Sequence, residues 1–360
     1  MRCSFLGRDL PYIVPDFSHS HPGTPASSTV LTAVPTPTPT PTPWPEHVTS
    51  NRERLDPYSV NMTHLELFNN LFSSEFLSLE KSERSDVIPT TIYIKHALTT
   101  PYLMYQVLAA SAFQLSIRTP KLRKFYREHA TGLQNRAISL FNESNPVLEV
   151  SPTNYVQMFL FSSLVGVHLL CDTLHHEKDS LEGFIDSFTQ CLNVNRGVLA
   201  VVNQCKHLLH EIELGPHLRM SKVLVQWTDA SGSECDALQD LIIAADISPS
   251  SRKAYQDAVL HLQRVFDAQR AASGNEIRIP VVFAWPIIVS PDYVDLLRQR
   301  QAEALVILAH YAVMLHRGRN LWLFGQGGRF LIESICESLD LTWQQWLEFP
   351  KAALLEDLTA

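Results

Sequence analysis

A histidine–histidine–glutamate set has the most suggestive metal-ligand spacing in the chain. On a helix, His207, His210 and Glu211 would occupy positions i, i+3 and i+4, so that one face presents two imidazoles and a carboxylate. Zinc accepts these ligand types, but three ligands from a single helix rarely hold the ion without a fourth from elsewhere. A solvated polar helix face explains the same spacing, and we favour that interpretation.

Two short motifs resemble signatures of phosphate and acyl chemistry. The sequence GQGG at 325–328 has the flexibility of a phosphate cradle, but it follows an apolar helical pattern rather than a strand, which predicts a turn between helices. The sequence SLEK at 78–81 matches S-x-x-K without the K-T-G that should follow, so we interpret it as a helix end. With no G-x-S-x-G elbow and no P-loop in the sequence, we expect a protein that is not an enzyme.

The cysteines and charges narrow the class of protein further. Six cysteines lie far apart and form no C-x-x-C pair, which predicts reduced thiols in a cytosolic or nuclear protein. The net charge of −8 argues against DNA binding by this chain unaided, because phosphates demand a concentrated basic surface. One basic cluster spreads around a helix and is interpreted as solvated surface; its members are Lys121, Arg123, Lys124 and Arg127.

Composition changes abruptly near residue 57. Half of the 22 prolines lie between Pro11 and Pro57, and the run PTPTPTPTPWP occupies positions 35–45. Such a segment favours extended polyproline II and cannot offset its ordering entropy by burial. We therefore expect residues 1–57 to form a disordered linker and residues 58–360 to form the folded domain.

Beyond the linker, apolar residues recur at helical spacing. We expect helices over 62–79, from Pro101, over 121–141, from Ser151-Pro152 to about Leu174, over 179–192, 194–212 and 252–272, and from Ser290 to about His316. Residues 213–250 are expected to be irregular, and VVFAW at 281–285 is the one stretch that could be a strand. The helices at 101–117 and 303–316 are apolar on nearly all sides, so they would enclose either a packed core or a ligand cavity. The fold class predicted is all-α.

The last segment of the chain carries two tryptophans that would share a helix face. Trp343 and Trp346 lie three residues apart, and Leu347 joins them four residues after Trp343. We expect this patch to pack near Leu305–Met314 as a structural anchor, with a cost of about 3–5 kcal/mol for truncating Trp346 to alanine.

Two stretches carry a resemblance to a known family. Tyr102–Ala130 contains YLMYQVLAASAFQLSI and KLRKFYREHA, and Ala302–Pro350 contains AEALVILAHYAVMLHR, LWLFGQGGRFLIESICESL and WQQWLEFP. In these stretches the chain resembles fungal zinc-cluster (Zn2Cys6) transcription factors of the sterol uptake control type. The likeness covers roughly residues 60–350, and the tryptophans of the second stretch make it the more specific match.

The resemblance implies a nuclear transcription regulator with a helical effector domain. Cys3 matches the last of the six cysteines that hold two zinc ions in the family's DNA-binding module; the other five would lie before Met1, so zinc is expected only if they exist, and an isolated thiol is the alternative. The family further implies a homodimer or heterodimer and, in sterol-sensing members, a hydrophobic small-molecule ligand. DNA contact would come only through the missing module.

Three readings of the function remain open. The first is the regulator, controlling a metabolic or secondary-metabolite gene set. The second is a DNA-binding-deficient homologue that acts by heterodimerising, and the third is an α-helical lipid-binding protein or enzyme. No membrane association is expected, since the most apolar stretch, Val156–Cys171, is several residues too short to span a bilayer and carries polar residues.

Overall fold

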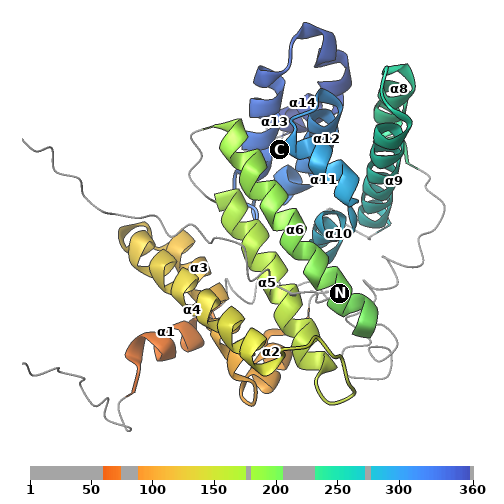
Figure 1. Cartoon of the computed structure of the whole chain (residues 1–360). Coiled ribbons are helices and arrows are strands. Elements are labelled where there is room, and N and C mark those ends of the chain that lie inside the picture. The colour runs from red at the N-terminus through yellow and green to blue at the C-terminus, as the bar shows by residue number, and fades with distance from the viewer. Residues whose placement is uncertain (1–59, 74–87, 176–179, 206–231, 272–276, 357–360) are drawn as a thin grey trace, which may run out of the picture. The chain divides into compact units, whose positions relative to one another are not determined.

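The chain folds into helices throughout the part that the computed structural model describes, which comprises residues 60–73, 88–175, 180–205, 232–271 and 277–356 (Figure 1). No residue in these ranges lies in a strand, so the all-α prediction is confirmed. The predicted linker at 1–57 lies outside them. The helices are α1 (Met62–Asn70), α2 (Thr90–Ala97), α3 (Pro101–Arg118), η2 (Pro120–Leu122), α4 (Arg123–Ser144), α5 (Tyr155–His175), α6 (Leu181–Cys205), α8 (Asp236–Ala244), α9 (Pro249–Arg270), α10 (Ile279–Ile288), α11 (Pro291–Arg298), α12 (Ala302–Arg317), α13 (Gly327–Ser338), η4 (Leu341–Leu347) and α14 (Glu348–Leu355).

Proline and serine at helix starts explain several boundaries. Helix α3 begins at Pro101 as predicted, because a proline at the first position needs no hydrogen-bond donor and already has a helical φ. Before α11, the Ser290 hydroxyl accepts a hydrogen bond from the Tyr293 amide at 3.2 Å, which caps the helix. Helix α5 starts at Tyr155 rather than at Ser151-Pro152, since the Asn154 carboxamide accepts from the Ser151 amide and holds a turn there.

The prediction of a single long helix from Ser290 to His316 is wrong, because the helix is interrupted at Arg300. Arg300 has a φ of 57°, in the left-handed region that residues other than glycine rarely adopt. Its amide donates to the Leu297 carbonyl at 2.9 Å, and the Gln301 amide donates to the Leu296 carbonyl at 3.2 Å. This pair of bonds is a Schellman motif, which ends α11 and lets α12 start in a new direction.

Three other expectations are corrected. Helix α6 is continuous where two helices were predicted, since its buried face runs on through Asn195, which is 1% exposed and donates to the Cys191 sulfur. Helix α8 lies within the stretch expected to be irregular. The possible strand at 281–285 is helix α10, whose side chains are buried nearly all round, and short apolar runs of this kind do not distinguish strand from helix.

Two groups of buried side chains form the core. One is built by α2, the first half of α3, the second half of α4 and the first half of α5. The other surrounds α12, whose residues Ala304–His316 are all buried and which contacts α8, α9, α11, α13, η4 and α14. Of the two alternatives for the helix at 303–316, a packed core or a ligand cavity, the structure shows the packed core. Helix α5 has the length and apolarity of a membrane span, but 67% of its most apolar 18-residue stretch is buried inside the protein.

The last segment packs on this second group as expected. Leu347 is fully buried, and both tryptophans of η4 are partly buried against the core around α12. Because Trp346 keeps part of its surface in solvent, the cost of truncating it should be smaller than the sequence suggested.

Candidate ligand cavity

The residues singled out in the sequence do not form a catalytic or metal site among the described residues. Cys3, the set at His207, His210 and Glu211, and the SLEK motif all lie outside the described ranges. Within those ranges, no three histidine, cysteine or acidic side chains lie close enough to hold a metal ion. In the basic cluster, Arg127 pairs with Asp172 of α5, and its other three members are exposed side chains.

A cavity of about 120 Å³ lies where the two core groups meet. Its wall combines side chains of α2, α3 and α5 with one residue just after α1, one just before α2, one residue of α10 and two residues of the turn between α12 and α13. Most of these side chains are apolar, and no lysine, arginine or carboxylate is among them. The lining residues are Leu71, Ile88, Thr90, Tyr93, Val107, Ala110, Phe113, Leu164, Val167, His168, Cys171, Ile279, Trp322 and Leu323.

His168 is the most informative polar group in the wall. It is 5% exposed, and its Nδ1 lies 3.3 Å from the Nε2 of Gln106, a fully buried residue of α3. Burial lowers the pKa of His168 to about 4, so the ring is neutral at pH 7. Since the Gln106 amide donates to Nδ1, the imidazole proton is on Nε2. Within the described ranges this is the only hydrogen bond of the ring, which leaves the Nε2–H without an acceptor.

The other ionisable groups in the wall are also uncharged at neutral pH. Burial raises the pKa of the Tyr93 hydroxyl and that of the Cys171 thiol, so both keep their protons. Two charged residues outside the wall act on His168: Asp172 raises its pKa and Arg127 lowers it. Their effects on the His168 pKa oppose each other, and the two side chains form an ion pair. Neither residue lines the cavity, so its wall consists of neutral groups only.

The GQGG sequence shapes the cavity wall rather than binding phosphate. Gly325 and Gln326 lie in the predicted turn between helices, whereas Gly327 and Gly328 are the first residues of α13, and Gly325 has a φ of +49°. A Cβ on Gly325 would lie 2.6 Å from Cε1 of His175, at the end of α5. The His175 Nε2 in turn lies 2.7 Å from the Trp322 carbonyl oxygen. Glycine thus allows the turn to approach α5 closely enough for Trp322 and Leu323 to line the cavity.

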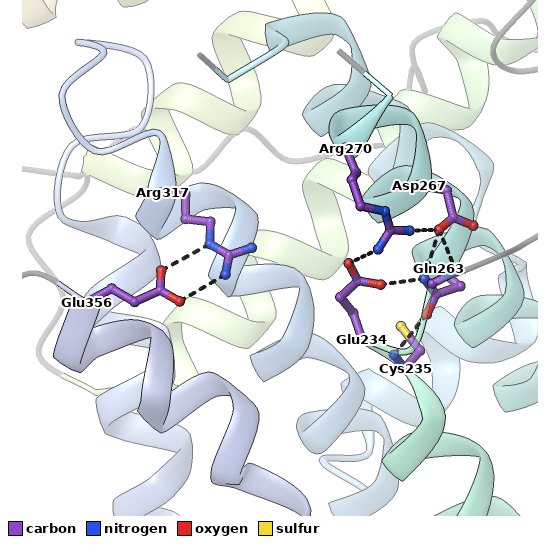
Figure 2. Close-up of polar contacts among 8 residues, drawn as sticks. Glu234, Cys235, Gln263, Asp267, Arg270, Arg317 and Glu356 are labelled. Atoms are coloured by element: carbon purple, nitrogen blue, oxygen red, sulfur yellow. Dashed lines mark hydrogen bonds and ion pairs between the residues drawn. The ribbon is translucent and has the colours of Figure 1, made fainter. Parts of the chain in front are cut away.

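Two polar clusters elsewhere have a structural explanation (Figure 2). At the start of α8, Glu234 accepts from Gln263 at 2.7 Å and from Arg270 at 2.5 Å, and Arg270 also pairs with Asp267. These contacts fasten the start of α8 to α9. In the second cluster, Arg317 of α12 donates to both carboxylate oxygens of Glu356, at 3.4 and 3.1 Å, just after α14. The charged groups in both clusters are paired with one another, so neither cluster is a candidate catalytic or binding site.

His310 shows what a buried histidine does away from the cavity. It is fully buried in α12, its Nδ1 donates to the Val306 carbonyl at 2.9 Å, and its ring stacks on Phe349. The Nε2 has no hydrogen-bond partner in the described part of the chain. Desolvation by burial lowers the pKa of His310 to about 4, against about 6.5 in an unfolded chain.

Replacing His310 with leucine should therefore flatten the acid side of the stability profile. Because the unfolded state takes up the proton first, wild-type stability falls as the pH drops from about 6.5 towards 4, by up to about 1.4 kcal/mol per pH unit for this group. The variant should match wild type within about 1 kcal/mol at pH 7 and gain about 2 kcal/mol relative to it at pH 5. Urea unfolding at both pH values measures this, and parallel profiles would contradict it.

Sequence reasoning missed His168 and Gln106 as a pair. Each is one of several polar residues in a mostly apolar, buried helix, and 62 positions separate them. Their only signal was polarity in a mostly apolar helix, which they share with other residues and which does not reveal the partner. No protein-family model matches the chain, and no curated protein sequence matches it either.

Proposed function

We propose that this chain is the regulatory part of a zinc-cluster transcription regulator, and that its helical domain responds to a small apolar ligand in the His168 cavity. The family resemblance at 102–130 and 302–350 supports the first part, and the all-helical fold agrees with it. The observation that carries the second part is the cavity itself, with a wall of neutral, mostly apolar side chains. In this proposal the protein acts in the nucleus as a homodimer or heterodimer.

The position of the cavity suggests how a ligand would act. Val107 and Leu71 belong to the core group of α2–α5, whereas Phe113 and Leu323 belong to the group around α12. A ligand between them would make contacts with both groups and stabilise their packing against each other. A ligand shifts an equilibrium only if it binds one state more tightly than the other. A ligand at this junction would bind more tightly when the two core groups are packed together than when they are apart, so it would favour the packed state.

DNA contact enters the proposal only through another part of the protein or through a partner. The net charge of −8 supports this, since no concentrated basic surface is evident in the sequence. A zinc cluster that includes Cys3 would supply the contact in one version of the proposal. In the other version the chain heterodimerises with a DNA-binding homologue and reduces its activity.

A lipid carrier is the rival that the same cavity supports, and a reporter experiment separates the two. The full chain, fused to an unrelated sequence-specific DNA-binding domain, should change transcription of a reporter carrying that domain's site. A carrier would leave the reporter at the level of the DNA-binding domain alone. An expressed, folded fusion that has no effect in either direction would therefore overturn the regulator.

Filling the cavity should be tolerated where filling packed core is not. Ala110 lines the cavity, whereas its neighbour Ala109 is fully buried in packed core. We expect Ala110→Leu to leave the free energy of unfolding unchanged or raised, and Ala109→Leu to lower it by about 1–3 kcal/mol. In the fusion, Ala110→Leu should make the transcription of the reporter independent of the ligand. Equal destabilisation by both substitutions would show that the cavity does not accept added atoms.

A further inference from the structure

We propose that the cavity selects a compact, uncharged ligand with one hydrogen-bond acceptor, which binds the Nε2–H of His168. This inference rests on the proposed function and specifies its ligand. It follows from the volume of the cavity, the neutrality of its wall and the hydrogen bond that fixes the imidazole proton.

The volume limits the size of the ligand. An apolar cavity of about 150 Å³ in another protein holds a benzene molecule. The cavity here, at about 120 Å³, therefore suits a single six-membered ring or a short branched chain rather than a large polycyclic molecule. Phe113, whose ring centroid lies 5.2 Å from that of His168, offers an aromatic surface beside the imidazole.

The wall decides the charge of the ligand. An ionised group taken from water into this cavity would lose its hydration, and no lining residue carries an opposite charge to replace it. Arg127, the cation that lowers the pKa of His168, is already paired with Asp172 and is not among the lining residues. A neutral molecule is therefore preferred over its carboxylate or ammonium analogue.

The hydrogen bond from Gln106 determines that the ligand must accept, rather than donate, a hydrogen bond at His168. Because Nδ1 accepts from Gln106, the opposite nitrogen can only donate, and it is the nitrogen left without a partner among the described residues. A hydroxyl, carbonyl or ether oxygen on the ligand would satisfy it. A ligand that supplies the acceptor therefore gains a hydrogen bond that a ligand which only fills space does not make.

The test compares phenol with toluene, which have nearly the same shape and differ in the hydroxyl, whose oxygen is the acceptor. Dissociation constants for the full chain are measured by calorimetry, and by ligand-observed NMR where binding is weak. The ratio of the toluene constant to the phenol constant should be about three- to tenfold higher in wild type than in His168→Leu. His310→Leu is the matched control, since it removes a buried histidine outside the cavity and should keep the wild-type ratio. Benzoate should not bind at pH 7.

A second readout covers the case in which His168→Leu does not fold. In wild-type protein labelled with ¹⁵N, the Nε2–H signal of His168 should move downfield with phenol and not with toluene. If both probes bind but neither the ratio nor this signal responds, the role of His168 is overturned and the ligand-sensing domain stands. If neither probe binds at millimolar concentration, the role of the cavity as a ligand site is overturned, and the regulator is then judged by the reporter experiment alone.

Discussion

Replacing Gly328 with alanine should lower the free energy of unfolding by about 3 kcal/mol, at the upper end of what overpacking costs. Gly328 lies in the first turn of α13, against α12. A Cβ at this position would lie 2.7 Å from the Ala312 carbonyl oxygen and still closer to the His316 amide nitrogen. Both are backbone atoms of a fully buried helix, so they cannot move aside as the end of a side chain would. Relief requires that α13 move away from α12.

Gly132 is the matched control for this substitution. It lies in α4, is exposed, and has nothing within 4 Å of the place its Cβ would take. Gly132→Ala should therefore stabilise the protein by about 0.5–1 kcal/mol, because alanine loses less backbone entropy in a helix. Chemical denaturation of both variants is the measurement. Effects of the same sign would contradict the close approach of α12 and α13.

The parts of the fold that local chemistry determines could be predicted from the sequence. Proline at position 101 and serine at 290 mark helix starts, and the apolar spacing of each long helix marks the buried face. The break at Arg300 could not be predicted, since the left-handed position that ends α11 carries arginine instead of glycine. Its side chain reaches across to Asp186 of α6 at 2.9 Å, a contact that only the folded chain reveals.

The cavity was less predictable than the helices. The sequence allowed a cavity or a packed core beside two apolar helices, and the structure gives one outcome for each. Helix α12 is packed on all sides, whereas α3 contributes Val107, Ala110 and Phe113 to the cavity wall. The difference arises from which side chains of α5, α10 and the α12–α13 turn meet α3. Such long-range complementarity leaves no periodic signal in the sequence.

Truncating Trp285 to alanine should have the largest effect of any single substitution considered, about 4–5 kcal/mol of lost stability. Trp285 of α10 is fully buried, and its indole nitrogen donates to the Ala258 carbonyl of α9 at 3.0 Å. Its ring stacks on Tyr311 of α12 at 4.6 Å and meets Tyr293 of α11 edge-on at 5.5 Å. One side chain thus joins four helices, and its loss leaves both a cavity and an unpaired carbonyl.

Trp346 provides the comparison, because the sequence suggested that it was the anchor. It is only partly buried against the core, so Trp346→Ala should cost about 1–2 kcal/mol, less than the sequence alone predicted. Guanidinium unfolding of the two variants beside wild type orders them directly. A typical domain is stable by about 5–15 kcal/mol, so Trp285→Ala removes a large share and should shift the midpoint far more than Trp346→Ala. The reverse order would mean that η4, rather than the junction of α9–α12, anchors the core.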